Sequence, residues 1–247
     1  MLYIVATPIG NAEEITFRAV ETLKTVDAIL CEDTRHSRPL LMRLGIEKPL
    51  ISYQKFNERA RSGEILERLK KGESIAVISD AGMPTVSDPG HVLIDEVIAN
   101  GLEYTVISGP CAAINALVLS GLSTEKFLFV GFLPDKKAER ERVISKYRDV
   151  DATLIFYLPL SDVDSVIDYL GETLGNRKCA LVREMTKKFE QVVRGTLCDL
   201  PEFTHKGEFV LVVEGEKEQN KELNALSVAE HIDFCLKGGI DKKEAIK

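Results

Sequence analysis

Short apolar runs rich in β-branched residues alternate with helical periods along the first half of the chain. The strand-like runs span residues 2–6, 28–31, 74–79 and 104–107. The helical periods span residues 16–24, 37–44, 58–71, 91–100 and 112–120. Because helices between successive strands favour a parallel sheet covered on both faces, the pattern predicts an α/β fold. Ligands of such a sheet bind at the carboxyl ends of its strands.

This rhythm changes after Gly121. Strand-like runs follow at residues 127–131, 153–157, 178–183, 191–196 and 208–213, with convincing helical periods only at 138–148 and 161–170. We therefore predict an N-terminal α/β domain over residues 1–120, built on a mainly parallel sheet with flanking helices, and a C-terminal mixed α/β domain over residues 121–215. Residues 216–247 are expected to form a charged linker and the start of a small helical tail, which looks truncated because a helical run reaches the last residue.

The composition is that of a folded globular protein. The 247 residues are 45% apolar and 29% charged, which excludes a disordered chain, a collagen and a coiled coil. No apolar run approaches the roughly 20 residues that span a bilayer, and the start lacks the basic and apolar regions of a signal peptide. We expect a cytoplasmic protein that does not bind membranes.

Cysteine and histidine spacing gives no sign of a metal site. The five cysteines form no C-x-x-C pair, and the four histidines match no H-E-x-x-H pattern. We therefore expect reduced thiols and no metal ligands that are close in sequence.

The charge is unevenly distributed. The net charge of −7 argues against a general nucleic-acid binder, but residues 35–71 carry +6 and residues 136–148 carry +4, which leaves −17 on the remainder. Such basic segments can contact phosphates. Ordinary solvated helix faces are the commoner explanation, and charge alone leaves both interpretations open.

Polar and small residues gather where predicted strands end, at residues 7–11, 32–37, 79–90 and 108–113. The third of these segments holds two Gly, two Pro, two Asp and three hydroxyl residues, so its backbone can be presented to a ligand. The glycine-rich motifs of dinucleotide-binding proteins and P-loop NTPases are absent, and so is the G-x-S-x-G motif of hydrolases.

Six runs of the sequence together resemble one known family. In chain order they are VATPIGN, CEDTRHS, SDAGMPTVSDPG, SGPCAAINAL, VREMTKKFEQVVRGT and GEFVLVVEG. Over about residues 1–215 they look like the tetrapyrrole methylase superfamily of S-adenosylmethionine-dependent methyltransferases, and most like its ribosomal RNA branch. The resemblance implies two α/β domains, a homodimer, and S-adenosylmethionine in the cleft between the domains. For the ribosomal branch it implies methylation of a cytidine ribose 2′-oxygen in small subunit (16S) ribosomal RNA.

The resemblance also assigns residues to the site. Around the cofactor it places Pro8, Ile9, Asp80, Ala81, Gly82, Met83, Cys111, Ala112, Tyr157, Met185 and Phe209. On the substrate side of the cleft it places Glu32, Asp33 and Arg35. The chain departs from the ribosomal branch at residues 158–162 and 54–56, and both departures concern the acceptor more than the methyl transfer itself.

The chemistry of methyl transfer limits what the side chains must do. A sulfonium methyl donor needs no metal, and the enzyme chiefly aligns the reactants and excludes water. A ribose hydroxyl must lose its proton, so a carboxylate is expected as general base. Asp33 is the first candidate and Glu184 the second, with an ion pair to Arg183 or Arg194 as the alternative role of Glu184.

Two other functions stay open at this point. A small-molecule tetrapyrrole or precorrin methylase would need a wide apolar trough lined by arginine, whereas the basic segments favour RNA. A relative that binds cofactor or RNA without catalysis is the second alternative.

Overall fold

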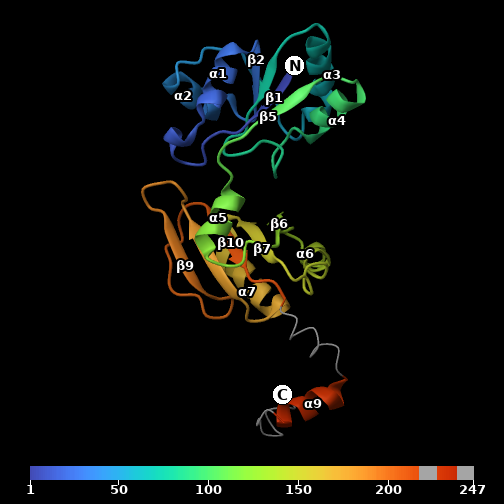
Figure 1. Cartoon of the computed structure of the whole chain (residues 1–247), viewed down its shortest axis with the longest axis vertical. Helices are drawn as coiled ribbons and strands as arrows, with labels where there is room; N and C mark the ends of the chain where they lie inside the picture. The colour runs from blue at the N-terminus through green and yellow to red at the C-terminus, as the bar shows by residue number, and fades with distance from the viewer. Residues whose placement is uncertain (217–226, 238–247) are drawn as a thin grey trace.

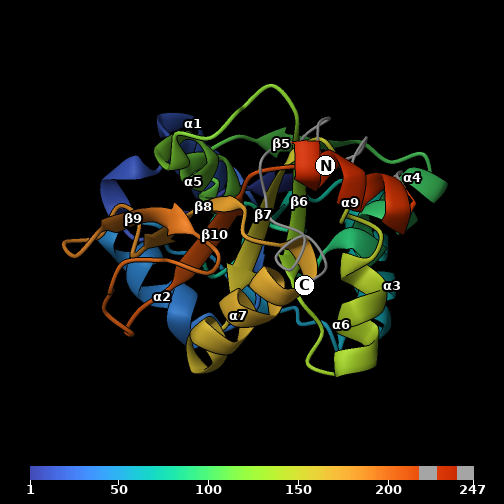
Figure 2. The same ribbon diagram turned by 90° about the horizontal axis from the view of Figure 1, so that it is seen from below.

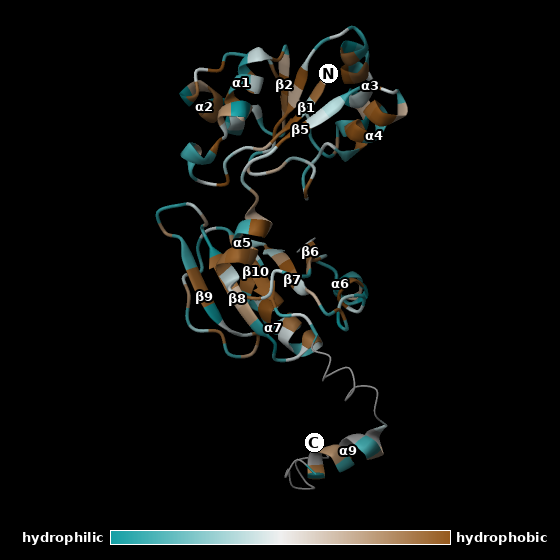
Figure 3. Ribbon diagram, viewed as in Figure 1, coloured by the Kyte–Doolittle hydropathy of each residue, from teal (hydrophilic) through white to brown (hydrophobic). Residues whose placement is uncertain are grey.

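The computed structural model describes residues 1–216 and 227–237. Figure 1 shows two sheets, one in each half of the chain, with the N-terminal half at the top of the view. In both sheets the hydrophobic residues concentrate in the central strands and in the helix faces that cover them (Figure 3).

The first sheet is entirely parallel. Its strands are β1 (Leu2–Val5), β2 (Ala28–Cys31), β3 (Leu50–Ser52), β4 (Ile75–Val77) and β5 (Tyr104–Ile107). They lie in the order β3-β2-β4-β1-β5, so every strand ends at the same edge of the sheet. Leu2, at the start of strand β1, is aligned with Ile75 on one side and Tyr104 on the other.

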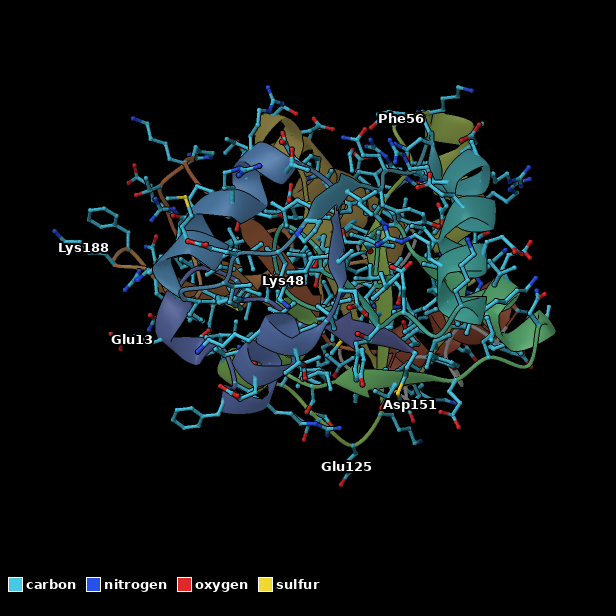
Figure 4. The ribbon with its side chains drawn as sticks, turned by 90° about the horizontal axis from the view of Figure 1, so that it is seen from above. Glu13, Lys48, Phe56, Glu125, Asp151 and Lys188 are labelled. Atoms are coloured by element: carbon cyan, nitrogen blue, oxygen red, sulfur yellow. The ribbon has the colours of Figure 1, made fainter. Side chains whose placement is uncertain are left out.

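Helices cover both faces of this sheet (Figure 4). They are α1 (Phe17–Thr25), α2 (Thr34–Arg43), α3 (Glu58–Lys70) and α4 (His91–Ala99), with the short helix η1 (Ala12–Glu14) before α1. Apolar side chains of α1 and α2 pack with one core cluster, and those of α3 and α4 pack with another. The central strands β1, β2 and β4 are thus buried on both sides, which explains their nearly continuous apolar sequences.

The second sheet is mixed. Its strands are β6 (Phe127–Phe132), β7 (Thr153–Leu158), β8 (Lys178–Arg183), β9 (Gln191–Thr196) and β10 (Phe209–Val213), in the order β6-β7-β10-β8-β9. Within this sheet β6 and β7 are parallel, and the other neighbours are antiparallel.

Alternate residues of these strands face two helical layers. Leu154 and Phe156 of β7 point to the cluster that contains α7 (Val163–Leu174), whereas Ile155 points to the cluster of α5 (Ala112–Ser120). Helix α6 (Lys137–Ile144) packs on the α7 side (Figure 2), and η2 (Leu160–Asp162) leads into α7. A final helix, α9, spans Val228–Lys237.

The predicted fold class is confirmed, and most predicted strands and helices are present within a few residues. The three-residue edge strand β3 was missed, because it is too short to show a period. Helix α2 begins at Thr34, three residues before its predicted start, because Asp33 caps it: the Asp33 carboxylate accepts the Arg35 amide.

The division into domains stays a prediction, but α5 bears on it. This helix falls inside the predicted N-terminal domain, yet it packs on β7, β8, β9 and β10 of the second sheet. The predicted charged linker and truncated tail over residues 216–247 fall mainly outside the described residues.

Two absences concern the described residues only. No helix over residues 1–216 and 227–237 is long and apolar enough to cross a membrane. Over the same ranges, no three side chains of His, Cys, Asp or Glu are grouped to hold a metal ion.

Candidate active site

A cavity of about 380 Å³ opens at the carboxyl ends of β1, β4 and β5, where the second sheet faces them. Its volume falls within the usual range for small-molecule sites. It is lined by Ile9, Ala81, Gly82, Met83, Val86, Ser87, Asp88, Cys111, Ala112, Phe132, Tyr157, Leu158, Pro159, Leu160, Met185, Gly207, Glu208, Phe209 and Val210. Both halves of the chain therefore contribute to one site.

The turn after β1 and the long loop after β4 are bonded to each other. The Thr7 amide donates to the Gly82 carbonyl at 2.9 Å, and the Gly82 amide donates to the Thr7 carbonyl at 3.2 Å. Gly82 has a φ of +80°, and a side chain there would approach Ile9 Cγ2 at 3.3 Å. Thr85 and Ser87 of the same loop also have positive φ, a strain that commonly occurs at functional sites.

Tyr157 joins the start of α5 to the second sheet. Its phenolic oxygen accepts the Ala113 amide, and burial raises the pKa of Tyr157 to about 12. Its ring contacts Phe129 and Phe132 edge to face, with centroids 4.9 and 5.4 Å apart. This contact brings the ends of β6 and β7 to the cavity.

A tight turn after β8 supplies Met185 and meets the turn after β1. The Asn11 amide donates to Thr186 Oγ1 at 2.9 Å, and Gly10 lies so close that a Cβ atom would approach Lys187 Cγ at 2.6 Å. These contacts join the two halves beside the cavity.

Glu184 lies in this turn but does not line the cavity. Its carboxylate accepts hydrogen bonds from the Lys187 ammonium and the Glu208 amide, both at 3.0 Å. Burial opposes ionisation of Glu184, but these hydrogen bonds outweigh it, so the pKa of Glu184 is lowered. Its partner is Lys187, and neither of the predicted partners, Arg183 and Arg194, bonds to it: they bond to backbone carbonyls instead.

Asp33 and Arg35 also lie outside the lining. The Arg35 guanidinium bonds to both carboxylate oxygens of Asp33, at 3.1 and 2.7 Å, and its amide adds a bond at 2.8 Å. These bonds lower the pKa of Asp33 to about 2. The carboxylate is thus engaged in capping α2 and is a weak proton acceptor.

Three other carboxyl groups gather at the ends of β2 and β4. Burial, and then the charges of Asp88 and Asp80, raise the pKa of Glu32 to about 7, although its carboxylate accepts the Asp80 amide. Burial also raises the pKa of Asp88 to about 6, against a hydrogen bond with Ser79. Asp88 lines the cavity, whereas Glu32 does not line it but is affected by the Asp88 charge. Perturbed groups of this kind concentrate at functional sites.

The cavity brings together nine of the eleven residues predicted around the cofactor. The two others are Pro8, which is buried next to Ile9, and Asp80, whose Oδ1 is buried without a hydrogen-bond partner. The residues predicted on the substrate side or as general base do not line the cavity: Glu32, Asp33, Arg35 and Glu184. The charge of Asp88, which does line it, raises the pKa of Glu32.

The prediction missed several lining residues. Asp88 belongs to the long loop that was singled out as ligand-binding, so its motif already contained the signal. Phe132 ends a strand of a parallel pair, where the rule of carboxyl ends points to a site. Gly207 and Glu208 precede strand β10 and begin the run GEFVLVVEG, so the resemblance already contained their signal.

Known proteins are similar to this chain over its whole length. Tetrapyrrole (Corrin/Porphyrin) Methylases match residues 1–201. Ribosomal RNA small subunit methyltransferase I of Halalkalibacterium halodurans is 42% identical, covering 100% of this chain and 88% of the relative. The protein of that name from Bacillus subtilis is 39% identical over the same shares. The one from Thermotoga maritima is 40% identical over 87% of this chain and 99% of its own.

Solved structures share the fold at lower identity. Uroporphyrin-III-C-methyltransferase from Thermus thermophilus has a TM-score of 0.60 and 21% identity, covering 86% of this chain and 93% of its own. Diphthine synthase has a TM-score of 0.66 and 16% identity, covering 87% and 89%. With the matched family and the relatives of about 40% identity, the fold leads to one conclusion: the chain belongs to the tetrapyrrole methylase family.

Proposed function

We propose that this protein is an S-adenosylmethionine-dependent methyltransferase that methylates a cytidine ribose 2′-oxygen in small subunit ribosomal RNA. The main support is the similarity to relatives named ribosomal RNA small subunit methyltransferase I. They match the whole chain, including every loop that lines the cavity. Because the chain covers 88% of those relatives, the similarity extends to nearly all of their length.

The cavity suits S-adenosylmethionine chemically. The cofactor, when bound, supplies a methyl group activated by a positively charged sulfur. The loop from Ala81 to Met83, the start of α5 at Cys111 and Ala112, and Met185 would hold it by backbone and apolar contacts. The partnerless Oδ1 of Asp80 is suited to accept a donor from a cationic ligand. The carboxyl groups beside it favour positive charge.

We assign the general base to the Glu32–Asp88 pair and not to Asp33. Asp88 lines the cavity, and the pKa values of the half-buried pair, about 7 and about 6, lie near neutrality, where a base can both accept and release a proton. Asp33 and Glu184 are each bound to a cation and held in the weakly basic ionised form.

The basic segments would hold the RNA backbone. Lys136, Lys137 and Arg142 of the α6 region are exposed and available for phosphates. Arg140 is different: its side chain is 13% exposed, its Nε donates to the Pro134 carbonyl at 3.0 Å, and it stacks over Tyr169. Arg140 therefore anchors α6, and we leave it out of the RNA surface.

We further propose a homodimer, as the resemblance implies, and a cytoplasmic location, as expected from the sequence. Light scattering at micromolar concentration tests the dimer, and a monomer there would contradict it.

The decisive experiment measures the modification in RNA. Small subunit RNA from cells with and without the gene is digested to nucleosides, and mass spectrometry should show one 2′-O-methylcytidine that depends on the gene. Restoration by the purified protein and S-adenosylmethionine in vitro completes the test. Methyl transfer to a porphyrinoid and not to RNA would favour the tetrapyrrole alternative. Cofactor binding without any transfer would favour the non-catalytic one.

A further inference from the structure

One ring at the cavity faces the opposite way from what its strand predicts. In a regular strand, side chains alternate, so Phe132 would share the face of Leu128 and Val130, which pack on the α7 side. In the structure, the pairing of β6 with β7 shifts between Phe129 and Gly131, where Gly131 has a φ of +75°. The extra residue places Phe132 opposite Tyr157, on the cavity side. Bulges of this kind commonly re-aim a side chain beside a site.

The Phe132 ring is held by a neighbouring ring but remains exposed to solvent. Its edge-to-face contact with Tyr157 has a centroid distance of 5.4 Å, and Tyr157 is itself held by Phe129 and the Ala113 amide. Phe132 nevertheless remains 56% exposed. A Cβ atom at Gly131 would approach Ser87 Oγ at 3.2 Å, so the bulge also lies against the loop after β4.

Two further apolar side chains complete this opening. Leu160 is 57% exposed and Val86 is 38% exposed, and both line the cavity with Phe132. Isolated apolar residues on a surface need no explanation, but three at the mouth of one cavity indicate a contact site. We call Val86, Phe132 and Leu160 the apolar rim.

Exposed lysines follow the rim residue Phe132 closely along the chain. Lys136 and Lys137 follow Phe132 by four and five residues, at the start of α6, and both are exposed. Lys136 makes a long surface contact with Glu139, at 3.4 Å. An exposed aromatic ring next to exposed cations is the arrangement that binds an unstacked nucleobase and its phosphates.

We propose that the apolar rim binds the base of the nucleotide that is methylated, with Phe132 as its stacking surface. This inference rests on the proposed function and names the contact that selects the acceptor. A ribose whose 2′-oxygen reaches into the cavity must leave its base stack, and the exposed ring of Phe132 replaces the stacking on neighbouring bases. The lysines at the start of α6 then hold the adjoining phosphates.

The test compares ring removal with ring retention. Binding of a fluorescent oligocytidylate is measured by anisotropy with the protein saturated with S-adenosylhomocysteine, for wild type, Phe132→Ala and Phe132→Tyr. Loss of the ring should weaken binding by about tenfold or more, whereas Tyr should bind within about twofold of wild type, because stacking depends on the aromatic face. Phe17→Ala removes a 94% exposed ring at the start of α1 that does not line the cavity, and serves as the matched control with unchanged binding.

Cofactor affinity separates this role from the obvious alternative. Calorimetry should give Phe132→Ala the wild-type affinity for S-adenosylmethionine. If cofactor affinity falls while oligocytidylate affinity is unchanged, the ring belongs to the cofactor site and the inference is overturned. Oligocytidylate binding by Phe132→Ala equal to that of wild type also overturns it. Neither readout requires methyl transfer, so a wild-type protein that fails to methylate ribosomal RNA refutes the proposed function separately.

Discussion

The carboxyl group of Glu32 lies close enough to that of Asp88 for the Asp88 charge to add to burial in raising the pKa of Glu32 to about 7. Asp88 lines the cavity, whereas Glu32 directly follows β2 and does not line it. Asp33, the next residue along the chain, is bound to Arg35 with a pKa of about 2. Adjacent residues therefore differ in pKa by far more than their sequence suggests.

This difference predicts how the rate depends on pH. Asp88→Asn should lower kcat by about 10²- to 10⁴-fold, because asparagine cannot accept a proton. In the wild type, kcat/KM should rise with pH up to about 7 and then level off, because the Glu32–Asp88 pair must be ionised to act as base. Glu32→Gln should change the pH at which kcat/KM rises, because it removes the carboxyl group of higher pKa.

Asp33→Asn is the matched control for both variants. It removes a carboxylate one residue from Glu32. The rise of kcat/KM near pH 7 should remain, because the Asp33 pKa lies far below that pH. A wild-type rate in Asp88→Asn would place the base elsewhere, and Glu184 would then be tested.

A second prediction concerns the loop after β4. Gly82→Val should weaken S-adenosylmethionine binding by at least tenfold, about 1.4 kcal/mol. The valine would need a left-handed backbone at φ +80° and would press on Ile9, which lines the cavity. Gly45→Val imposes similar strain at φ +66°, with open space around it and away from the cavity. It should lower stability without changing cofactor affinity, as calorimetry would show, and equal affinities in folded Gly82→Val and wild type would remove this loop from the cofactor site.

The third prediction concerns charge at the start of α6. Replacing Lys136, Lys137 and Arg142 by glutamine should weaken binding to small subunit RNA and make the log–log salt slope shallower by about one unit for each phosphate-binding side chain that is removed. S-adenosylmethionine affinity should not change, because none of the three lines the cavity. A wild-type salt slope in the triple variant would identify these residues as an ordinary solvated face. Arg140→Gln should instead lower thermal stability, since Arg140 bonds to the Pro134 carbonyl and lies over Tyr169.

The fourth prediction concerns a buried ion pair. Arg177 and Glu216 are 8% and 6% exposed and bond to each other. Arg177→Met should lower the free energy of unfolding by about 3–5 kcal/mol, because Glu216 would remain buried without its partner. Urea unfolding measures this, and the double variant with Glu216→Leu should regain most of that stability. Lys70→Met, which breaks an exposed pair with Glu67, should cost less than about 1 kcal/mol, and a similar cost at Arg177 would mean that the buried pair is not needed for stability.

Most secondary-structure elements and the loops of the site could be predicted from local sequence patterns. Apolar alternation and helical periods are local, and they located the strands from Leu2 to Val213, except β3, and the main helices between them. Small and polar residues cluster in the loops after β1, β2, β4 and β5. Because ligands of a parallel sheet bind at the carboxyl ends of its strands, these loops were predicted to form the site. The resemblance then named nine residues that the structure brings to one cavity.

The roles of those residues depend on contacts that form only when the chain folds. The pKa of a carboxyl group depends on burial and on charges that are distant in sequence, so Glu32 and Asp33 look equivalent until Asp80, Asp88 and Arg35 are placed around them. The bulge at Gly131 turns Phe132 to the cavity through pairing with β7, and no local pattern contains that pairing. Likewise, α5 joins the second sheet because its apolar face fits there, a consequence of packing between segments far apart in the chain.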